Sequence, residues 1–283
     1  MRYLIAGGRG MLGTDLALAL AGREVTRLGS SELDITDRAA AIAAAAGHDV
    51  VINAAAYVKV DDAETNEADA TAVNAIGAEN LAVAARLAGA RFVQVSTDYV
   101  FDGTATTPYP ENTPLAPLGA YGRSKAEGEQ RVLAEYADGS YIVRTAWLYG
   151  KNGGNFASTM LNLAANRPPV SVVNDQFGQP TWTLDLANQI VALLDADAPA
   201  SVYHGTNSGA ASWFEFARAI YEESGLDPER VTPTDSAAFV RPAPRPSYSV
   251  LGHDAWATAG LSPMRPWREA LSAAVAAKVL SND

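Results

Sequence analysis

The fold of this 283-residue chain is decided by its first stretch, residues 2–13, which read RYLIAGGRGMLG. The apolar run Arg2–Ala6 predicts a buried strand, residues 14–21 predict a helix, and residues 24–28 predict a second strand. Between them, Gly7 allows a tight turn, Gly10 lets the backbone approach a pyrophosphate, and Gly13 lets the helix pack against the strand. This order favours a dinucleotide-binding unit over a simple tight turn.

Strands and helices continue to alternate beyond this unit. Apolar strand patterns at 49–53, 91–96 and 141–144 are separated by helical patterns, such as the one at 74–88. Such alternation predicts an α/β fold, a Rossmann-type doubly wound parallel sheet. The alternation breaks after residue 150. We therefore expect a Rossmann domain at 1–150, to which later segments return, and a smaller C-terminal lobe at 151–283 that mainly binds substrate.

Composition excludes several classes of protein. Hydrophobic residues make up 48% of the chain, no apolar run reaches the roughly 18 residues of a transmembrane helix, and the net charge is −11. We therefore expect no membrane partner and no nucleic-acid partner. The chain has no cysteine, and its three histidines lack metal-ligand spacing. These features predict a cytoplasmic protein without a metal site.

The end of the second strand bears on the cofactor. An acid often stands there in NAD sites, whereas this strand ends with Arg27, followed by Ser30 and Ser31. Arg27 with either serine could hold a 2′-phosphate, which favours NADPH, while Glu32 keeps NADH possible. An Arg27 that is merely solvated fits the pattern as well.

Residues 121–125, YGRSK, place a phenol and an ammonium four residues apart. If this stretch opens a helix, Tyr121 and Lys125 share one face, and the ammonium is expected to lower the pKa of the phenol from its usual value of about 10. A Tyr tuned in this way can exchange protons during catalysis. Alone, the spacing is also typical of an ordinary solvated helix.

Two hydroxyls stand at a strand end before this pair. Ser96 and Thr97 cannot both face the same site, because side chains alternate along a strand. The residues alone leave the choice between them open. They are also compatible with a polar strand end that only caps a turn.

Together these motifs resemble the extended short-chain dehydrogenase/reductase family and, within it, the dTDP-4-dehydrorhamnose reductases. The resemblance is carried by STDYVFDG (96–103), YGRSK (121–125), RTAWLYG (144–150) and QPT (179–181). It implies that Thr97, rather than Ser96, is catalytic with Tyr121 and Lys125. It also implies a dTDP-sugar substrate that meets Thr97, Asp98 and Trp147. With the residue-based expectations above, the cofactor-binding set is Gly7, Gly10, Met11, Leu12, Gly13, Arg27, Asp34, Ile35, Ala54, Ala55, Ala56, Tyr121 and Lys125.

The resemblance further implies NAD(P)H-dependent reduction of the 4-keto group of a dTDP-4-dehydro-6-deoxy-L-hexose, foremost dTDP-4-dehydrorhamnose to dTDP-L-rhamnose. Tyr121 would protonate the developing alkoxide, Thr97 would hydrogen-bond the same oxygen, and Lys125 would bind the nicotinamide ribose. Arg241 or Arg245 would pair with the substrate pyrophosphate. Two alternatives remain: a ketoreductase for another dTDP-sugar and a non-catalytic NADP-binding regulatory subunit.

Departures from related patterns limit these expectations. Dehydratases of the superfamily carry a Glu after the Thr-Asp pair, whereas Tyr99 stands here, so dehydration is disfavoured. Some reductases of this family form a magnesium-bridged dimer. Asp15 matches one of the acids involved, but Leu184 stands where another acid would be. Magnesium is therefore doubtful, and the chain is expected to be a monomer or a homodimer.

Overall fold

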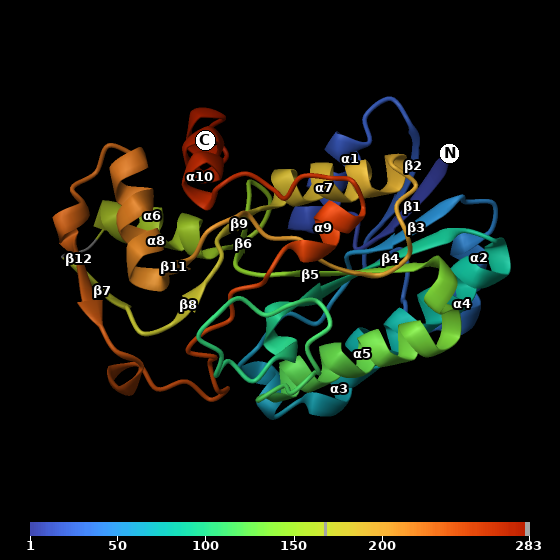
Figure 1. The fold of residues 1–283 in the computed structure, drawn as a ribbon, viewed down its shortest axis with the longest axis horizontal. Coiled ribbons are helices and arrows are strands. Elements are labelled where there is room, and N and C mark those ends of the chain that lie inside the picture. Colours follow the sequence, from blue (N-terminus) through green and yellow to red (C-terminus); the bar gives the residue numbers. More distant parts are fainter. Residues whose placement is uncertain (167–168, 281–283) are drawn as a thin grey trace.

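The computed structural model describes residues 1–166 and 169–280, and a six-stranded sheet lies at its centre (Figure 1). The strand order is β10-β5-β4-β3-β1-β2, and every pairing within the sheet is parallel. The strands are β1 (Arg2–Ala6), β2 (Glu24–Leu28), β3 (Val50–Asn53), β4 (Arg91–Thr97), β5 (Ser140–Thr145) and β10 (Val202–His204). The predicted Rossmann-type α/β fold is confirmed.

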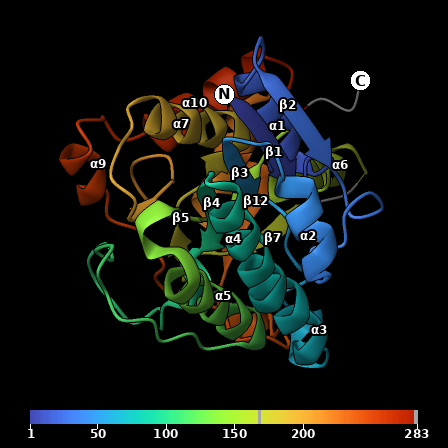
Figure 2. The same cartoon turned by 90° about the vertical axis from the view of Figure 1, so that its right-hand side faces the viewer.

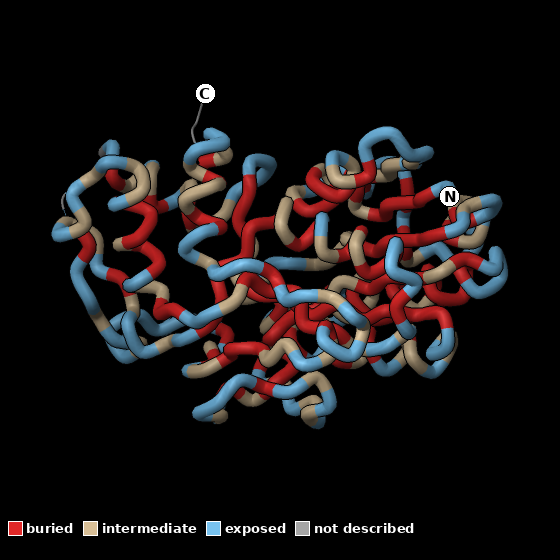
Figure 3. The backbone as a smooth tube through the Cα atoms, turned by 45° about the horizontal axis from the view of Figure 1, so that its top comes forward, coloured by how far each residue is buried: buried red, intermediate tan, exposed pale blue. Residues whose placement is uncertain are grey.

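Helices cover both faces of this sheet (Figure 2). On one face lie α1 (Met11–Ala19), α7 (Thr183–Asp195) and the short α9 (Asp254–Thr258). On the other lie α2 (Arg38–Ala45), α4 (Gly77–Ala88) and α5 (Ala120–Tyr136). Strand alternation explains the two cores: Tyr3 and Ile5 pack toward α1 and α7, whereas Leu4 and Ala6 pack toward α2 and α4. Figure 3 shows buried segments running through the interior of the molecule, whereas β2, at the edge of the sheet, has no buried residue.

The start of α1 differs from the prediction. The helix begins at Met11 rather than at Thr14, so the last residues of the glycine loop already form its first turn. The sequence pattern missed this start because Gly13 is a poor helix former, while tertiary packing overrides that propensity. The short α3 (Glu67–Thr71) and a π-helical turn (Ala72–Ile76) precede α4.

A second core lies beside the sheet. It is formed by α6 (Phe156–Asn166), α8 (Trp213–Glu223) and α10 (Trp267–Ala276), with Phe216, Ile220 and Leu271 fully buried among them. Three two-stranded ladders complete this lobe: β6 (Leu148–Tyr149) with β9 (Thr181–Trp182), β7 (Val170–Val173) with β12 (Val231–Thr234), and β8 (Phe177–Gly178) with β11 (Ala211–Ser212). Between these segments the chain returns to the central sheet as α7 and β10.

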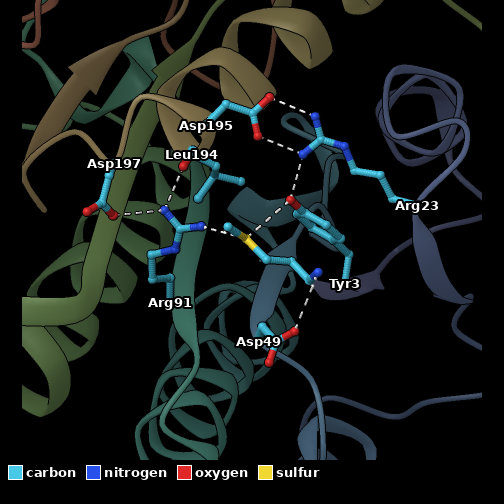
Figure 4. Close-up of polar contacts among 8 residues, drawn as sticks. Tyr3, Arg23, Asp49, Arg91, Leu194, Asp195 and Asp197 are labelled. Atoms are coloured by element: carbon cyan, nitrogen blue, oxygen red, sulfur yellow. Dashed lines mark hydrogen bonds and ion pairs between the residues drawn. The ribbon is translucent and has the colours of Figure 1, made fainter.

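The amino end of the central sheet is closed by polar contacts (Figure 4). Arg23 donates to both carboxylate oxygens of Asp195, each at 2.7 Å, and to the Tyr3 hydroxyl at 2.8 Å. Arg91 donates to the Leu194 carbonyl at 2.7 Å. We call Tyr3, Arg23, Arg91 and Asp195 the amino-end cluster. It fixes the end of α7 against β1 and β4.

No helix within residues 1–166 and 169–280 has the length and apolarity needed to cross a bilayer.

Candidate active site

The carboxyl end of β4 meets the first turn of α5. A Cβ on Gly122 would lie 2.3 Å from the Tyr99 carbonyl oxygen, so only glycine lets the helix approach this closely. The Ala120 N–H donates to Glu64 Oε1 at 2.8 Å, which satisfies one of the free donors at the helix start. The result is that Tyr121 lies beside the end of β4, with its ring edge-on to Tyr99 at a centroid distance of 5.7 Å.

Thr97, and not Ser96, is the hydroxyl that meets Tyr121. The Thr97 side chain is buried, and its hydroxyl acts to lower the pKa of the Tyr121 phenol. Its Oγ1 also donates to Asp98 Oδ1 at 3.0 Å and accepts from the Tyr99 N–H at 3.2 Å. The Ser96 hydroxyl is buried without a hydrogen-bond partner among the described residues. The geometry therefore separates the two hydroxyls that the sequence pattern left open.

Lys125 is buried one helical turn beyond Tyr121, and its Nζ donates to the Val95 carbonyl at 2.7 Å. Burial lowers the pKa of Lys125 to about 8, and the negative charge of Glu129 partly opposes this shift.

The expected depression of the Tyr121 pKa is not found in this structure. Burial raises the pKa of Tyr121 to about 12; the Asp98 charge adds to that shift and the Thr97 hydrogen bond opposes it. The Lys125 ammonium is instead engaged by the Val95 carbonyl. The phenol therefore keeps its proton at neutral pH, which suits a proton donor better than a base.

Asp98 is a second acid with an altered proton affinity. Its carboxyl group is buried, and burial raises its pKa to about 6, although hydrogen bonds from Ser249 and Thr97 oppose the shift. Asp98 thus changes its charge close to physiological pH, within hydrogen-bond distance of Thr97. Perturbed groups of this kind concentrate at functional sites.

The glycine loop fits the pyrophosphate of a dinucleotide. Gly7 has φ of 75°, and a Cβ there would lie 2.5 Å from the Ala55 backbone nitrogen. A Cβ on Gly13 would lie 2.3 Å from the Gly7 carbonyl oxygen. Gly10 precedes α1 as its N-cap residue and offers no side-chain cap, so the N–H groups of Met11 and Leu12 remain available to phosphate oxygens. The loop lies against the half-buried Ala54, Ala55 and Ala56, beyond the carboxyl end of β3.

The end of β2 is organised differently from the expectation. Arg27 turns back to donate to the Gly8 carbonyl at 2.8 and 3.0 Å and to Thr14 Oγ1 at 3.1 Å. Glu32 accepts from Arg9 at 2.9 and 3.1 Å and from the Gly29 N–H at 2.8 Å. The bond from Arg9 is the main reason why the pKa of Glu32 falls to about 2. Arg9 is thus a cation beside the expected nucleotide site that the sequence analysis did not predict. Its position inside the glycine motif is the feature of the sequence that could have indicated it.

The remaining predicted cofactor residues lie just beyond β2. Asp34 is exposed, and its Oδ1 accepts from the Thr36 N–H at 2.9 Å. The Ile35 side chain is buried, and a Cβ on Gly77 would lie 2.6 Å from its Cγ1. Only Asp34 of this pair therefore presents its side chain to solvent.

Two predicted substrate elements border the same edge of the sheet. Trp147 follows β5 by two residues, and Thr145 at the end of β5 is the register partner of Thr97. Arg245 donates to Asp61 Oδ1 at 2.9 Å, and Arg241 lies 3.8 Å from the other Asp61 oxygen. One carboxylate therefore holds both arginines that were expected to meet a pyrophosphate.

The two positions related to a magnesium-bridged dimer, Asp15 and Leu184, lie at α1 and not at the end of β4. Asp15 accepts a hydrogen bond from the Thr183 hydroxyl, and burial raises its pKa. Asp15 and Leu184 line one surface cavity beside α1. Among residues 1–166 and 169–280, no three His, Asp or Glu side chains cluster as metal ligands would.

Known proteins share both the sequence and the fold of this chain. A dTDP-4-dehydrorhamnose reductase of Mycobacterium tuberculosis is 50% identical over 283 residues, covering 98% of this chain and 93% of that protein. A dTDP-4-keto-6-deoxy-D-glucose reductase of Streptomyces niveus is 47% identical over 277 residues, covering 96% of each. The crystal structure of dTDP-4-dehydrorhamnose reductase from Bacillus anthracis in complex with NADP matches with a TM-score of 0.92 at 38% identity, covering 98% of this chain and 99% of that one.

A family model described as the RmlD substrate binding domain matches residues 1–279. This match spans both the central sheet and the lobe. The chain belongs to the RmlD substrate binding domain family.

Proposed function

We propose that this chain is an NADPH-dependent reductase of the 4-keto group of a dTDP-4-dehydro-6-deoxy-L-hexose, foremost dTDP-4-dehydrorhamnose, which yields dTDP-L-rhamnose. One observation carries the proposal: the buried Thr97 at the end of β4 and Tyr121 in the first turn of α5, with Lys125 one turn further along, lie at the same sheet edge as the glycine loop. The names of the relatives support it, because the M. tuberculosis and B. anthracis proteins are dTDP-4-dehydrorhamnose reductases.

The roles of the residues follow from this geometry. A bound nicotinamide cofactor supplies the hydride for the carbonyl carbon. Tyr121 holds a proton at its phenol oxygen and gives it to the carbonyl oxygen as negative charge develops there. Thr97 Oγ1 hydrogen-bonds that oxygen and stabilises the charge. Lys125, held at the Val95 carbonyl, lies one turn from the phenol and binds the nicotinamide ribose.

Residues 1–150 hold the cofactor in this proposal, and residues 151–283 mainly hold the substrate. The glycine loop, from Gly7 to Gly13, and Ala54–Ala56 receive the pyrophosphate. Arg9 is the cation best exposed to a 2′-phosphate, since Arg27 is engaged by the Gly8 carbonyl. NADPH is the proposed cofactor, in keeping with the NADP bound to the B. anthracis protein.

The substrate side comprises Asp98, Trp147 and the arginines at Asp61. A diphosphate that binds Arg241 and Arg245 would compete with the Asp61 carboxylate for them. A monomer or homodimer in the cytoplasm is the proposed state of the enzyme.

A second candidate is the same 4-keto reduction on another dTDP-sugar. It is favoured by the S. niveus relative, whose identity of 47% is close to the 50% of the M. tuberculosis protein although its name specifies a D-glucose derivative. A purely regulatory NADP-binding role is less consistent with the chain, because such a protein has no need for Thr97, Tyr121 and Lys125 together.

The test is an assay of NADPH absorbance with dTDP-4-dehydrorhamnose generated in situ, with dTDP-4-keto-6-deoxy-D-glucose in parallel. Tyr121→Phe should lower kcat by about 10²–10⁴-fold while NADPH still binds. Tyr136→Phe, at the far end of α5, is the matched control and should retain wild-type kcat. Wild-type rates in Tyr121→Phe would refute the assignment, and preference for the second sugar would select the second candidate. Replacing NADPH by NADH measures the cofactor preference.

A further inference from the structure

Trp147 has an unusual backbone for a large side chain. Its φ is 46°, in the left-handed region that bulky residues avoid. The Thr181 N–H donates to its carbonyl at 3.2 Å, and the next two residues pair with Thr181 and Trp182 in the β6–β9 ladder. Such a conformation persists only where the surroundings hold it, and it concentrates at functional sites.

The indole of Trp147 is held by the lobe. It stacks on Trp213, with ring centroids 3.5 Å apart and an interplanar angle of 10°. A Cβ on Gly178 would lie 2.5 Å from Trp147 Cε2, so the missing side chain at 178 leaves the space that the indole fills. One ring partner and one glycine thus define where this indole can lie.

A single ladder presents both of these features. Gly178 pairs with Ala211, and Ser212 follows to cap α8, whose first residue is Trp213. Ser212 Oγ accepts from the Glu215 N–H at 3.1 Å, and the Glu215 carboxylate accepts from the Ser212 N–H at 2.7 Å. This capping box fixes the start of the helix, and with it the origin of the Trp213 side chain.

The two indoles lie at the margin of the lobe core, against which both pack. Both are half-buried, whereas Phe216, one helical turn further along α8, is fully buried and supplies the packing. Trp147 stands two residues beyond Thr145, the register partner of Thr97, so its backbone follows the strand end next to the proposed reaction centre. A flat, partly open ring there suits the apolar face of a hexose or a thymine base.

We propose that Trp213 is a positioning residue: it holds Trp147 in its left-handed conformation, and the Trp147–Trp213 stack, in the space left by Gly178, sets the affinity for the dTDP-sugar. This inference rests on the proposed function for the identity of the ligand. It assigns no chemical step to Trp213, whose effect passes through Trp147.

The test uses the full chain, five single variants and one double variant. Trp213→Leu removes the stack, Trp213→Phe keeps a smaller ring, and Gly178→Ala displaces the Trp147 indole without removing any aromatic residue. Trp267→Phe is the matched control, because Trp267 packs on Phe216 in the same lobe and is not stacked on Trp147. The readouts are the far-ultraviolet circular dichroism couplet of the stacked indoles, KM and kcat for the ketosugar, the Kd for dTDP and the Kd for NADPH.

We expect Trp213→Leu and Gly178→Ala to weaken the couplet and to raise KM and the dTDP Kd about tenfold, with kcat and the NADPH Kd near wild-type values. Trp213→Phe should fall between them and wild type, and Trp267→Phe should match wild type. Combining Trp213→Leu with Trp147→Leu should raise KM no further than Trp147→Leu alone, because both act through one element.

An unchanged KM in Trp213→Leu despite loss of the couplet would overturn the inference. So would an equal rise of KM in Trp267→Phe, or a matching loss of NADPH affinity, since either would indicate general damage to the lobe. A wild-type protein that binds dTDP but reduces no ketosugar would refute the proposed function alone, and the dTDP affinities of the variants would still decide the role of Trp213.

Discussion

The two ends of the central sheet place their ionisable side chains in opposite environments. At the amino end, the Arg23–Asp195 pair is partly exposed to solvent, with side-chain exposures of 32% and 44% (Figure 4). At the carboxyl end, Asp98 and Lys125 are buried, and neither forms an ion pair with a described residue; Asp98 accepts a hydrogen bond from Thr97, and Lys125 donates to the Val95 carbonyl. Both ends are built from the same parallel strands.

The pKa values show what this difference means. Hydrogen bonding to Arg23 lowers the pKa of Asp195, so that its charge is favoured in the folded protein. Burial raises the pKa of Asp98 to about 6 and lowers that of Lys125 to about 8, so both charges are disfavoured. The amino end therefore holds charges that favour the fold weakly, and the carboxyl end holds groups that exchange protons near neutral pH.

One buried ion pair underlies the carboxyl end. Arg144 on β5 donates to Glu129 Oε2 on α5 at 2.7 Å, and it also donates to the Glu111 carbonyl in the loop before α5 at 3.0 Å. His204 beside it is neutral, because burial lowers its pKa to about 3. This pair fixes α5, and so Tyr121 and Lys125, against the sheet.

Removing half of this pair should have the largest effect. Glu129→Gln leaves Arg144 buried and uncompensated, and we expect it to lower the free energy of unfolding by about 3–5 kcal/mol. Glu127→Gln is the matched control on the same helix, because its partner Arg131 is exposed, and it should cost about 1 kcal/mol or less. Urea denaturation followed by circular dichroism measures both, and equal losses would contradict the assigned difference.

The hydroxyl at the end of β4 gives the next largest effect. Thr97→Val keeps the shape but removes the donor to the developing oxyanion, and kcat should fall by about 10²–10³-fold. Ser96→Ala removes the neighbouring buried hydroxyl, which has no partner in the described parts of the chain, and should leave kcat unchanged. Steady-state assays measure kcat of both variants. A larger loss of kcat in Ser96→Ala than in Thr97→Val would show that Ser96, and not Thr97, is the catalytic hydroxyl.

The pH dependence of stability should distinguish Asp98 from an exposed acid. Its pKa is about 6 when folded and 3.8 in the unfolded reference, so the folded protein binds more protons between these values. Stability must then fall as pH rises through this window, by a total of about 3 kcal/mol. Asp98→Asn should remove this fall in denaturation curves taken from pH 4 to 7.

Asp102 is the control, because its pKa is shifted in the opposite direction to that of Asp98. The hydrogen bond from the Tyr109 hydroxyl lowers the pKa of Asp102, so its stabilisation is present above pH 4 and is lost as pH falls further. Asp102→Asn should therefore leave the fall between pH 4 and 6 in place. A fall that also persists in Asp98→Asn would show that another group titrates there.

Much of this site could be predicted from sequence because local rules control it. The glycine loop, the end of β4 and the i, i+4 relation of Tyr121 and Lys125 each depend on residues close in the chain. Contacts over long separations could not be predicted: Trp147 on Trp213, Arg144 on Glu129, and Arg9 on Glu32. The pKa of Tyr121 moved opposite to expectation for the same reason, since burial raises it and the Lys125 ammonium is engaged by the Val95 carbonyl.

The amino-end cluster should give the smallest effect and so complete the comparison. Asp195→Asn breaks the pair with Arg23, yet both side chains remain hydrated, and we expect a loss of about 0–1 kcal/mol in unfolding free energy. That loss should shrink further in 1 M salt, where the Debye length falls to about 3 Å, whereas the effect of Glu129→Gln should persist. Ketosugar reduction should be unchanged, because Asp195 lies at the opposite end of the sheet from Tyr121. A loss as large as that of Glu129→Gln would mean that the two ends are not distinguished by solvent access, and that the geometry of the pairs matters more than their burial.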